Sequence, residues 1–310
     1  MTTPSGERAF SNSMEYSIGV DLGGTNIKFA VVSNDGELLD YRTCDTADQQ
    51  GSWAQTIKEK TDAIQKERGA AACHIGIASP GLAAKDGRSI AHMQGRLNGL
   101  QGFVWTGFLD SPRPVVVLND AHAALLGEVW KGAAAGYSNV ILLTLGTGVG
   151  GALLIDGRLA KGHIGRAGHL GHVSLNSDGA PDIVGTPGSI EEMIGNYNLK
   201  ERSGGRFTST RQLVEAHLSG DDQASTIWLR SIFHLGVAIA SFINAFDPEV
   251  VIIGGGIAQA GAALFDPLSR YLDKFEWRPL GQGVPIVATS LGEKAGAIGA
   301  AYHAILQNVD

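Results

Sequence analysis

The sequence predicts two related α/β lobes around a cleft, because two similar cycles of strands, glycine turns and helices follow one another along its 310 residues. A chain of this length holds about two domains. Glycine supplies 43 residues, about twice the usual share of ~7%. Proline supplies only 10, so this excess is not that of a collagen or a low-complexity chain. The reason for this excess must therefore lie in the positions of the glycines along the chain.

Composition excludes several classes of protein. Cys44 and Cys73 are too few for a disulfide framework, which favours a reducing cytoplasm. The net charge of −7 argues against a nucleic-acid surface, and Met1–Tyr16 lacks the apolar core of a signal peptide. The uncharged stretch Ala133–Ile155 is interrupted by glycines and polar residues, so it predicts two buried strands rather than a membrane span.

The first cycle begins with a meander of strands. Asn34-Asp35-Gly36 is a hairpin signal between the second and third strands. We expect strands at Tyr16–Asp21, Ile27–Ser33, Glu37–Arg42, His74–Ala78 and Val115–Asn119, and helices at Trp53–Arg68 and Ala121–Val129.

The second cycle repeats this layout from Val140 onward. We expect strands at Val140–Leu145, Gly150–Ile155, Val250–Ile253 and Pro285–Ala288, and helices at Ile190–Lys200, Thr210–Leu218, Thr226–Phe246, Gly261–Asp273 and Lys294–Leu306. The corner at Asp21–Thr25 matches the corner at Leu145–Gly148, which indicates a weak internal duplication.

The first glycine corner, Asp21-Leu22-Gly23-Gly24-Thr25, could bind phosphate. Gly23 and Gly24 let the backbone approach a ligand, and N–H groups at such a corner can face phosphate oxygens, with a hydroxyl from Thr25. Asp21 could hold a water on Mg²⁺, and Lys28 could reach a phosphate. Taken alone, the motif fits an ordinary tight hairpin better.

Two further glycine clusters follow strands. Gly146, Thr147 and Gly148 begin a G-x-G-x-x-G pattern, but a strand rather than a helix comes next, so we exclude a dinucleotide fingerprint and keep a phosphate-facing corner. Gly254-Gly255-Gly256 follows a buried strand, where ligands of open α/β sheets bind. Such a flat backbone could receive a nucleobase and ribose.

Asn119-Asp120 stands where a strand meets a helix. Either residue could simply cap the helix, or Asp120 could be the general base that deprotonates a substrate hydroxyl in phosphoryl transfer. His163, His169 and His172 cluster in a glycine-rich loop, but no Cys follows Cys73, so polar ligands or structural histidines fit better than a metal site.

Together these residues resemble the ROK family of sugar kinases and repressors, within the actin-like/hexokinase ATPase superfamily. The resemblance runs from about Ser17 to Ala300. Five signatures occur in the family's order: Asp21–Thr25, Gly76–Gly81, Asn119–Glu128, Leu145–Gly151 with Gly157–Leu159, and Ile252–Gly256. The resemblance implies two actin-like (ribonuclease H-like) lobes, which we expect at residues 1–118 plus 295–310 and at 119–294.

The resemblance also implies an ATP-dependent kinase that uses Mg²⁺ and phosphorylates a hydroxyl, most plausibly the 6-hydroxyl, of a hexose or N-acetylhexosamine. It makes Asp120 the catalytic base and implies a cytoplasmic homodimer. The implied cofactor-binding residues are Asp21, Gly23, Gly24, Thr25, Lys28, Gly146, Thr147, Gly148, Gly254, Gly255 and Gly256. The implied sugar ligands are Asn98, Asn119, Asp120, His169, His172 and Glu191.

Two departures from the family pattern stand out. His169 replaces the family's Glu in A-G-E-x-G-H, which exchanges an obligate acceptor for a group that can donate and puts the usual glucose preference in doubt. The zinc cysteines C-x-C-G-x-x-G-C are missing: Asp178–Gly188 fills that region and Ser189 stands at the last Cys. We therefore expect no zinc site, and a segment held by packing alone.

Two other functions compete with a kinase. A transcriptional regulator of this family would carry a helix-turn-helix domain ahead of the first corner, for which the 20 residues before Asp21 are too few. A catalytically inactive sugar-binding protein is supported only by His169, since Asp120 and both corners match the family pattern.

Overall fold

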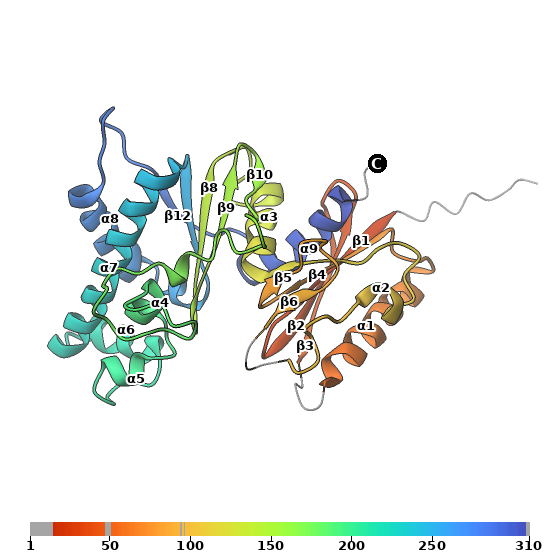
Figure 1. The fold of residues 1–310 in the computed structure, drawn as a ribbon, viewed down its shortest axis with the longest axis horizontal. Coiled ribbons are helices and arrows are strands. Elements are labelled where there is room, and N and C mark those ends of the chain that lie inside the picture. Colours follow the sequence, from red (N-terminus) through yellow and green to blue (C-terminus); the bar gives the residue numbers. More distant parts are fainter. Residues whose placement is uncertain (1–14, 47–50, 94, 96, 308–310) are drawn as a thin grey trace, which may run out of the picture.

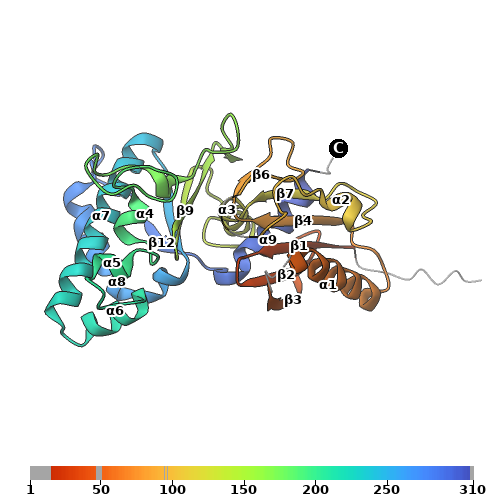
Figure 2. The same ribbon diagram turned by 60° about the horizontal axis from the view of Figure 1, so that its bottom comes forward.

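Two five-stranded sheets form the centres of two lobes. The computed structural model describes residues 15–46, 51–93, 95 and 97–307, so nearly all of Met1–Tyr16 lies outside the described residues. The strand orders are β3-β2-β1-β4-β7 and β10-β9-β8-β11-β12. Figures 1 and 2 show the sheets side by side, with helices α3 (Asp120–Lys131) and α9 (Ala295–Leu306) between them. The prediction of two α/β lobes is confirmed.

The first sheet is an antiparallel meander extended by parallel strands. Its strands are β1 (Tyr16–Leu22), β2 (Asn26–Ser33), β3 (Leu38–Asp45), β4 (His74–Ser79) and β7 (Val116–Asn119). β4 pairs in parallel with β1, and β7 with β4. Helix α1 (Ser52–Arg68) covers one face with Trp53, Ile57 and Ile64, while α9 packs on the other face. β1 is therefore buried on both faces.

The second sheet repeats this plan, which confirms the internal duplication. Its strands are β8 (Val140–Leu145), β9 (Val149–Ile155), β10 (Arg158–Leu159), β11 (Val250–Gly254) and β12 (Ile286–Ala288). Again the first three strands form an antiparallel meander, and the later strands add in parallel beside its first strand. The uncharged run thus forms the two predicted strands around a turn.

Helices of the second lobe depart from prediction in two places. They are α4 (Ile190–Ile194), α5 (Leu199–Arg202), α6 (Thr210–Leu218), α7 (Asp222–Phe246) and α8 (Ala262–Phe275). The helix predicted at Ile190–Lys200 is wrong: Gly195, with ψ of 147°, ends α4, and α5 starts anew. Helix α7 begins earlier than predicted, because the Asp221 carboxylate caps it by accepting from Ala224 N–H.

In the first lobe, the structure adds three short elements that the pattern did not predict. These are the hairpin of β5 (Leu82–Ala83) and β6 (Ile90–His92), and the helix α2 (Trp105–Phe108). They are too short to show a period, and Trp105 and Ile90 are buried in the first lobe's core.

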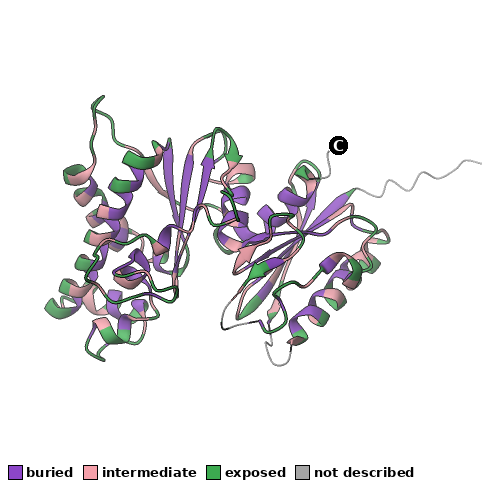
Figure 3. Ribbon diagram, viewed as in Figure 1, coloured by how far each residue is buried: buried purple, intermediate pink, exposed green. Residues whose placement is uncertain are grey.

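Within the described residues, α7 is the one helix long and apolar enough to cross a membrane by length and composition. Its face with Trp228, Ile232, Leu235 and Ile239 is fully buried in the second lobe's core (Figure 3). That burial is typical of a core helix in a soluble protein.

Helices α3 and α9 touch backbone to backbone through glycines. A Cβ at Gly299 would stand 1.8 Å from the Ala123 carbonyl oxygen, and one at Gly127 would stand 2.4 Å from that of Ala295. Gly19 of β1 and Gly76 of β4 give α9 the same close approach to the sheet. Part of the glycine excess is therefore explained by this packing and not by ligands.

Candidate active site

The first glycine corner is the turn between β1 and β2. Gly23 N–H donates to the Asn26 carbonyl at 3.0 Å, and the Thr46 hydroxyl anchors the turn by donating to the Gly23 carbonyl at 2.6 Å. Thr25 is exposed, and Gly24 is partly exposed. The corner is thus held rigidly from behind, with its tip accessible.

Asp21 lies behind this corner in a charged setting, with 15% of its side chain exposed. Lys28 pairs with it across the hairpin, with Nζ 3.5 Å from Oδ2. A Cβ at Gly296 would stand 2.9 Å from Oδ2, so the N-terminus of α9 approaches the carboxylate. Burial raises the pKa of Asp21 to about 6, with Lys28 opposing the shift and Asp120 adding to it. Asp21 is therefore largely ionised at neutral pH.

The second corner, between β8 and β9, is fixed from both sides. Gly146 N–H closes the turn on the Gly148 carbonyl at 2.9 Å. The backbone N–H groups of Asn196 and Tyr197, after α4, donate to the Gly146 and Thr147 carbonyls, each at 3.0 Å.

Glu191, a predicted sugar ligand, also holds the second corner. Its Oε2 accepts from Val149 N–H at 2.8 Å, and a Cβ at Gly148 would stand 2.2 Å from that oxygen. Burial raises the pKa of Glu191, although the bond to Val149 opposes this. The predicted sugar site and the second corner therefore share one carboxylate.

The three glycines after β11 have different surroundings. Gly255 has φ of +86° and lies against Leu145, whose carbonyl oxygen would stand 2.3 Å from a Cβ. Gly254 faces the Thr289 side chain. A Cβ at Gly256 would meet nothing within 4 Å. Packing and φ thus account for the choice of glycine at 254 and 255, while Gly255 and Gly256 are exposed.

Asn119 takes the capping role that the sequence left open between it and Asp120. The Asn119 side chain caps α3: its Oδ1 accepts from Ala121 N–H at 2.9 Å and from His122 N–H at 3.3 Å. Its Nδ2 donates to the Gly81 carbonyl at 3.0 Å. Asp120 begins α3 with Oδ1 bound to Ala121 N–H at 2.8 Å, and burial raises the pKa of its carboxyl.

His169 lies near Asp120, and their charges interact. Its Nδ1 is buried and has no hydrogen-bond partner within the described residues. Burial lowers the pKa of His169. The ring of His122 stands 6.0 Å away, held by a 3.0 Å contact between Nε2 and the Ala167 carbonyl. The half-buried imidazole of His169 thus keeps one nitrogen without a partner among the described residues.

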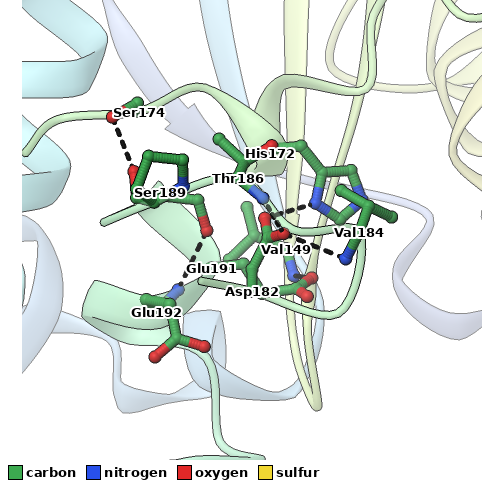
Figure 4. A network of polar contacts seen from close by, with 10 residues as sticks. Val149, His172, Ser174, Asp182, Val184, Thr186, Ser189, Glu191 and Glu192 are labelled. Carbon is green, nitrogen blue, oxygen red and sulfur yellow. Dashed lines mark hydrogen bonds and ion pairs between the residues drawn. The ribbon is translucent and has the colours of Figure 1, made fainter. Parts of the chain in front are cut away.

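His172 is held by a carboxylate that the sequence did not single out. Its Nδ1 lies 2.8 Å from Oδ2 of Asp182, whose side chain is 0% exposed. Oδ1 of Asp182 accepts from Val184 N–H at 3.0 Å and Thr186 N–H at 2.9 Å (Figure 4). The expectation of a segment held by packing alone is therefore wrong, since hydrogen bonds to Asp182 organise it.

The remaining predicted residues lie apart. Asn98 is exposed in the turn before α2, and no hydrogen bond within the described chain joins it to the other candidate ligands. His163 is exposed as well. No group of three or more His, Cys, Asp or Glu side chains that could hold a metal occurs in the ranges described above. The donors around His172, a carboxylate and Ser189, do not fit the cysteine-rich zinc site of the family pattern, whose cysteines this chain lacks.

Comparison with known proteins identifies the family of this chain. Residues 17–306 match the sequence model of the ROK family, so the chain belongs to that family. It is 33% identical to a glucokinase of Thermotoga maritima, over 92% of this chain and 95% of the relative. An N-acetylmannosamine kinase of Shigella boydii is 29% identical, over 93% and 97%.

Solved structures agree with this placement. A ROK hexokinase of Thermus thermophilus superposes with a TM-score of 0.81 at 31% identity, over 94% of this chain and 98% of that one. A ROK glucokinase of Streptomyces griseus, solved with glucose and AMPPNP, gives 0.77 at 28% identity, over 93% and 99%. The two lobes therefore have the actin-like ATPase fold.

Proposed function

We propose that this chain is an ATP-dependent sugar kinase that phosphorylates a hydroxyl, the 6-hydroxyl, of a hexose or N-acetylhexosamine. The position of Asp120 carries the proposal. Its charge interacts with that of Asp21 behind the first corner. The next residue, Ala121, lies close to the second corner. Its Cβ is 3.4 Å from the position that a Cβ added to Gly150, just past that corner, would occupy. A half-buried carboxylate thus stands beside both phosphate-type corners.

The two corners suit ATP with Mg²⁺. A Cβ added at Gly146 or Gly256 would have no neighbour within 4 Å, which leaves backbone free to approach a nucleotide. We assign Gly23, Gly24, Thr25 and Lys28, with Gly146–Gly148, to the phosphates, and Gly254–Gly256 to the adenosine. Asp21 would hold a water of Mg²⁺, a cation that binds through few carboxylates. ATP and Mg²⁺ supply the phosphoryl group and neutralise its charge when bound.

Asp120 is the general base in this proposal. It takes the proton of the sugar hydroxyl while that oxygen forms a bond to the γ-phosphorus and the bond to ADP breaks. The sugar is oriented by Asn119, His169, His172 and Glu191, with Asn98 assigned more distantly. Asn119 keeps one amide N–H for this task, because its other polar groups already cap α3 and bind Gly81. We also propose a cytoplasmic homodimer with no nucleic-acid or membrane partner.

ADP release with a panel of hexoses, amino sugars and N-acetylhexosamines tests the proposal. Wild type should turn over at least one sugar, while Asp120→Asn should lose nearly all turnover and still bind that sugar, as measured by calorimetry. Asp45→Asn removes an exposed carboxylate from β3 and should keep full activity.

Two results would contradict this assignment. Retained turnover in purified Asp120→Asn would remove the base from that residue. Wild type that binds sugars but turns over none would indicate the inactive sugar-binding protein instead.

A further inference from the structure

Asp182 forms a buried centre in the loop between η2 (Leu170–His172) and α4. Both of its oxygens are in use: Oδ1 takes the backbone N–H groups of Val184 and Thr186, and Oδ2 faces His172 Nδ1 (Figure 4). The Asp182 backbone adds bonds to Thr186 and Gly185, at 3.0 and 2.9 Å. One carboxylate therefore both folds the loop and holds an imidazole.

The charge of Asp182 fixes what His172 can do. Burial alone would raise the pKa of this carboxyl, but the hydrogen bonds from His172, Thr186, Ser189 and Val184 outweigh burial, and the pKa lies below its ordinary value. An ionised carboxylate can only accept hydrogen bonds. The Nδ1 of His172 must therefore carry a proton.

We propose that Asp182 is a positioning residue that keeps His172 in the Nδ1–H form, so that its Nε2 offers a lone pair to a sugar hydroxyl. The imidazole has one donor and one acceptor nitrogen when neutral, and the partner of one nitrogen sets the role of the other. Nε2 lies on the opposite side of the ring from Asp182, and His172 keeps 23% side-chain exposure. This inference rests on the proposed function only in taking a sugar as the ligand of Nε2.

The same centre explains how the chain dispenses with the cysteine motif. A metal on one imidazole nitrogen fixes the ring's orientation and leaves the other nitrogen to a partner. Here the Asp182 carboxylate, fully buried, occupies one nitrogen of His172. Ser189, at the place of a cysteine, instead caps α4 through Glu192 N–H at 3.4 Å. A hydrogen-bonded centre thus does the orienting.

Asp182→Asn tests the proposal sharply. The amide oxygen of Asn can keep both backbone bonds of Oδ1, which turns the NH₂ group toward His172 Nδ1. Nδ1 must then accept, and the proton moves to Nε2. The loop should therefore stay folded, with a thermal midpoint close to that of wild type, while the role of His172 toward a sugar reverses.

Two measurements follow the reversal. Long-range proton–nitrogen NMR spectra of the sugar-free protein should show a proton on Nδ1 of His172 in wild type and on Nε2 in Asp182→Asn. The KM for the sugar should rise about 10–100-fold, the range typical for loss of a group that orients a histidine ligand, with KM for ATP unchanged. Asp178→Asn, an exposed carboxylate of the same loop, is the control and should change neither.

A double-mutant cycle separates positioning from loop support. In a His172→Ala background, Asp182→Asn should raise the sugar KM no further, because the two residues act through one bond. Three results would each overturn the proposal. The first is additive effects of the two substitutions on the sugar KM, and the second is a proton on Nε2 of His172 in wild type. The third is one bound zinc per chain whose removal by a chelator also unfolds the protein. Absence of turnover with every sugar would contradict the kinase assignment instead, while the NMR result still decides on the proton.

Discussion

Burial sets the charge of the acids and bases at this site. It raises the pKa of Asp21 and Asp120 and lowers that of His169. It also lowers the pKa of His122 to about 4, so this imidazole is neutral at physiological pH. These residues are held in an environment that disfavours their charged forms, which is common at functional sites.

Asp21→Asn should stabilise the protein at pH 8 and impair catalysis. Because folding raises the pKa of Asp21 from 3.8 to about 6, the ionised carboxylate opposes folding above pH 6. That penalty is up to about 3 kcal/mol, at about 1.4 kcal/mol per pKa unit. It fades as pH falls through 6 and is absent below about pH 4. Urea unfolding at pH 8 and pH 4 should show the gain only at pH 8.

Asp45→Asn is the control, because this exposed carboxylate should change stability little at either pH. Equal stability of Asp21→Asn and wild type at pH 8 would show that burial of Asp21 costs nothing. The kinase assay should show lower kcat for Asp21→Asn alone.

His169→Glu should shift sugar preference toward glucose. The buried Nδ1 of His169 has no hydrogen-bond partner in the described part of the chain, and a carboxylate there would accept hydroxyl donors that an imidazole N–H cannot. We expect kcat/KM for glucose, relative to the best wild-type sugar, to rise about tenfold or more. The new charge beside Asp120 should also raise the pKa of that base, moving the acidic limb of the pH–rate profile upward. His163→Glu, at an exposed position, should leave both unchanged; an unaltered sugar ranking for His169→Glu would refute the specificity role.

At the scale of elements, small residues let α9 lie between a sheet and a helix. Gly19 and Gly76 stand opposite each other in the parallel pairing of β1 and β4, and each meets a carbonyl of α9. Gly299 meets α3 from the other side. Backbone contact of this kind leaves no room for a methyl group, and close packing makes the cost of adding one large.

Gly299→Ala should destabilise the chain by about 3 kcal/mol or more, since its Cβ would stand 1.8 Å from the Ala123 carbonyl oxygen and one helix must shift. Gly107→Ala provides the matched control: this helical glycine has no neighbour within 4 Å of a Cβ, so the change should be neutral or slightly stabilising. Chemical unfolding of both variants measures the difference. Equal unfolding midpoints for the two variants would show that α3 and α9 can move apart without loss of stability.

At the scale of the whole molecule, Glu128 connects α3 to the segment between the second sheet and α9. This fully buried carboxylate accepts from Ala133 N–H at 2.7 Å, Leu291 N–H at 2.9 Å and Ser290, through N–H and hydroxyl, at 3.1 Å. We propose that the lobes comprise residues 1–118 with 295–310, and 119–294. Glu128 would then stabilise the return of the chain from one lobe to the other.

Glu128→Ala should lower the free energy of unfolding by about 2–4 kcal/mol, because it leaves part-buried backbone N–H groups without their acceptor. Glu249→Ala is the comparison: that carboxylate also binds two backbone N–H groups, of Ser138 and Asn139, but it is exposed. Water can replace it, so its loss should be clearly smaller. Similar losses for both variants would contradict a special role for the buried connection.

Local sequence patterns predicted most of the helices and strands, but not the contacts between residues far apart in the sequence. The apolar runs and the glycine turn of β8 and β9 are complete within the segment itself, so they could be read from the sequence. The break at Gly195 and the second role of Glu191 depend on contacts with the β8–β9 corner. No local period records such a contact.

The sequence by itself determined the two repeated lobes, the glycine corners at strand ends and the Asn119-Asp120 pair, because each depends on neighbours in the chain. Tertiary structure decided which glycines serve packing and that Asp182 holds His172. It also decided that Asn119, rather than Asp120, caps α3 by accepting from the His122 N–H. The physical reason is that hydrogen-bond partners and close contacts are chosen by distance in the folded chain, where residues far apart in sequence meet.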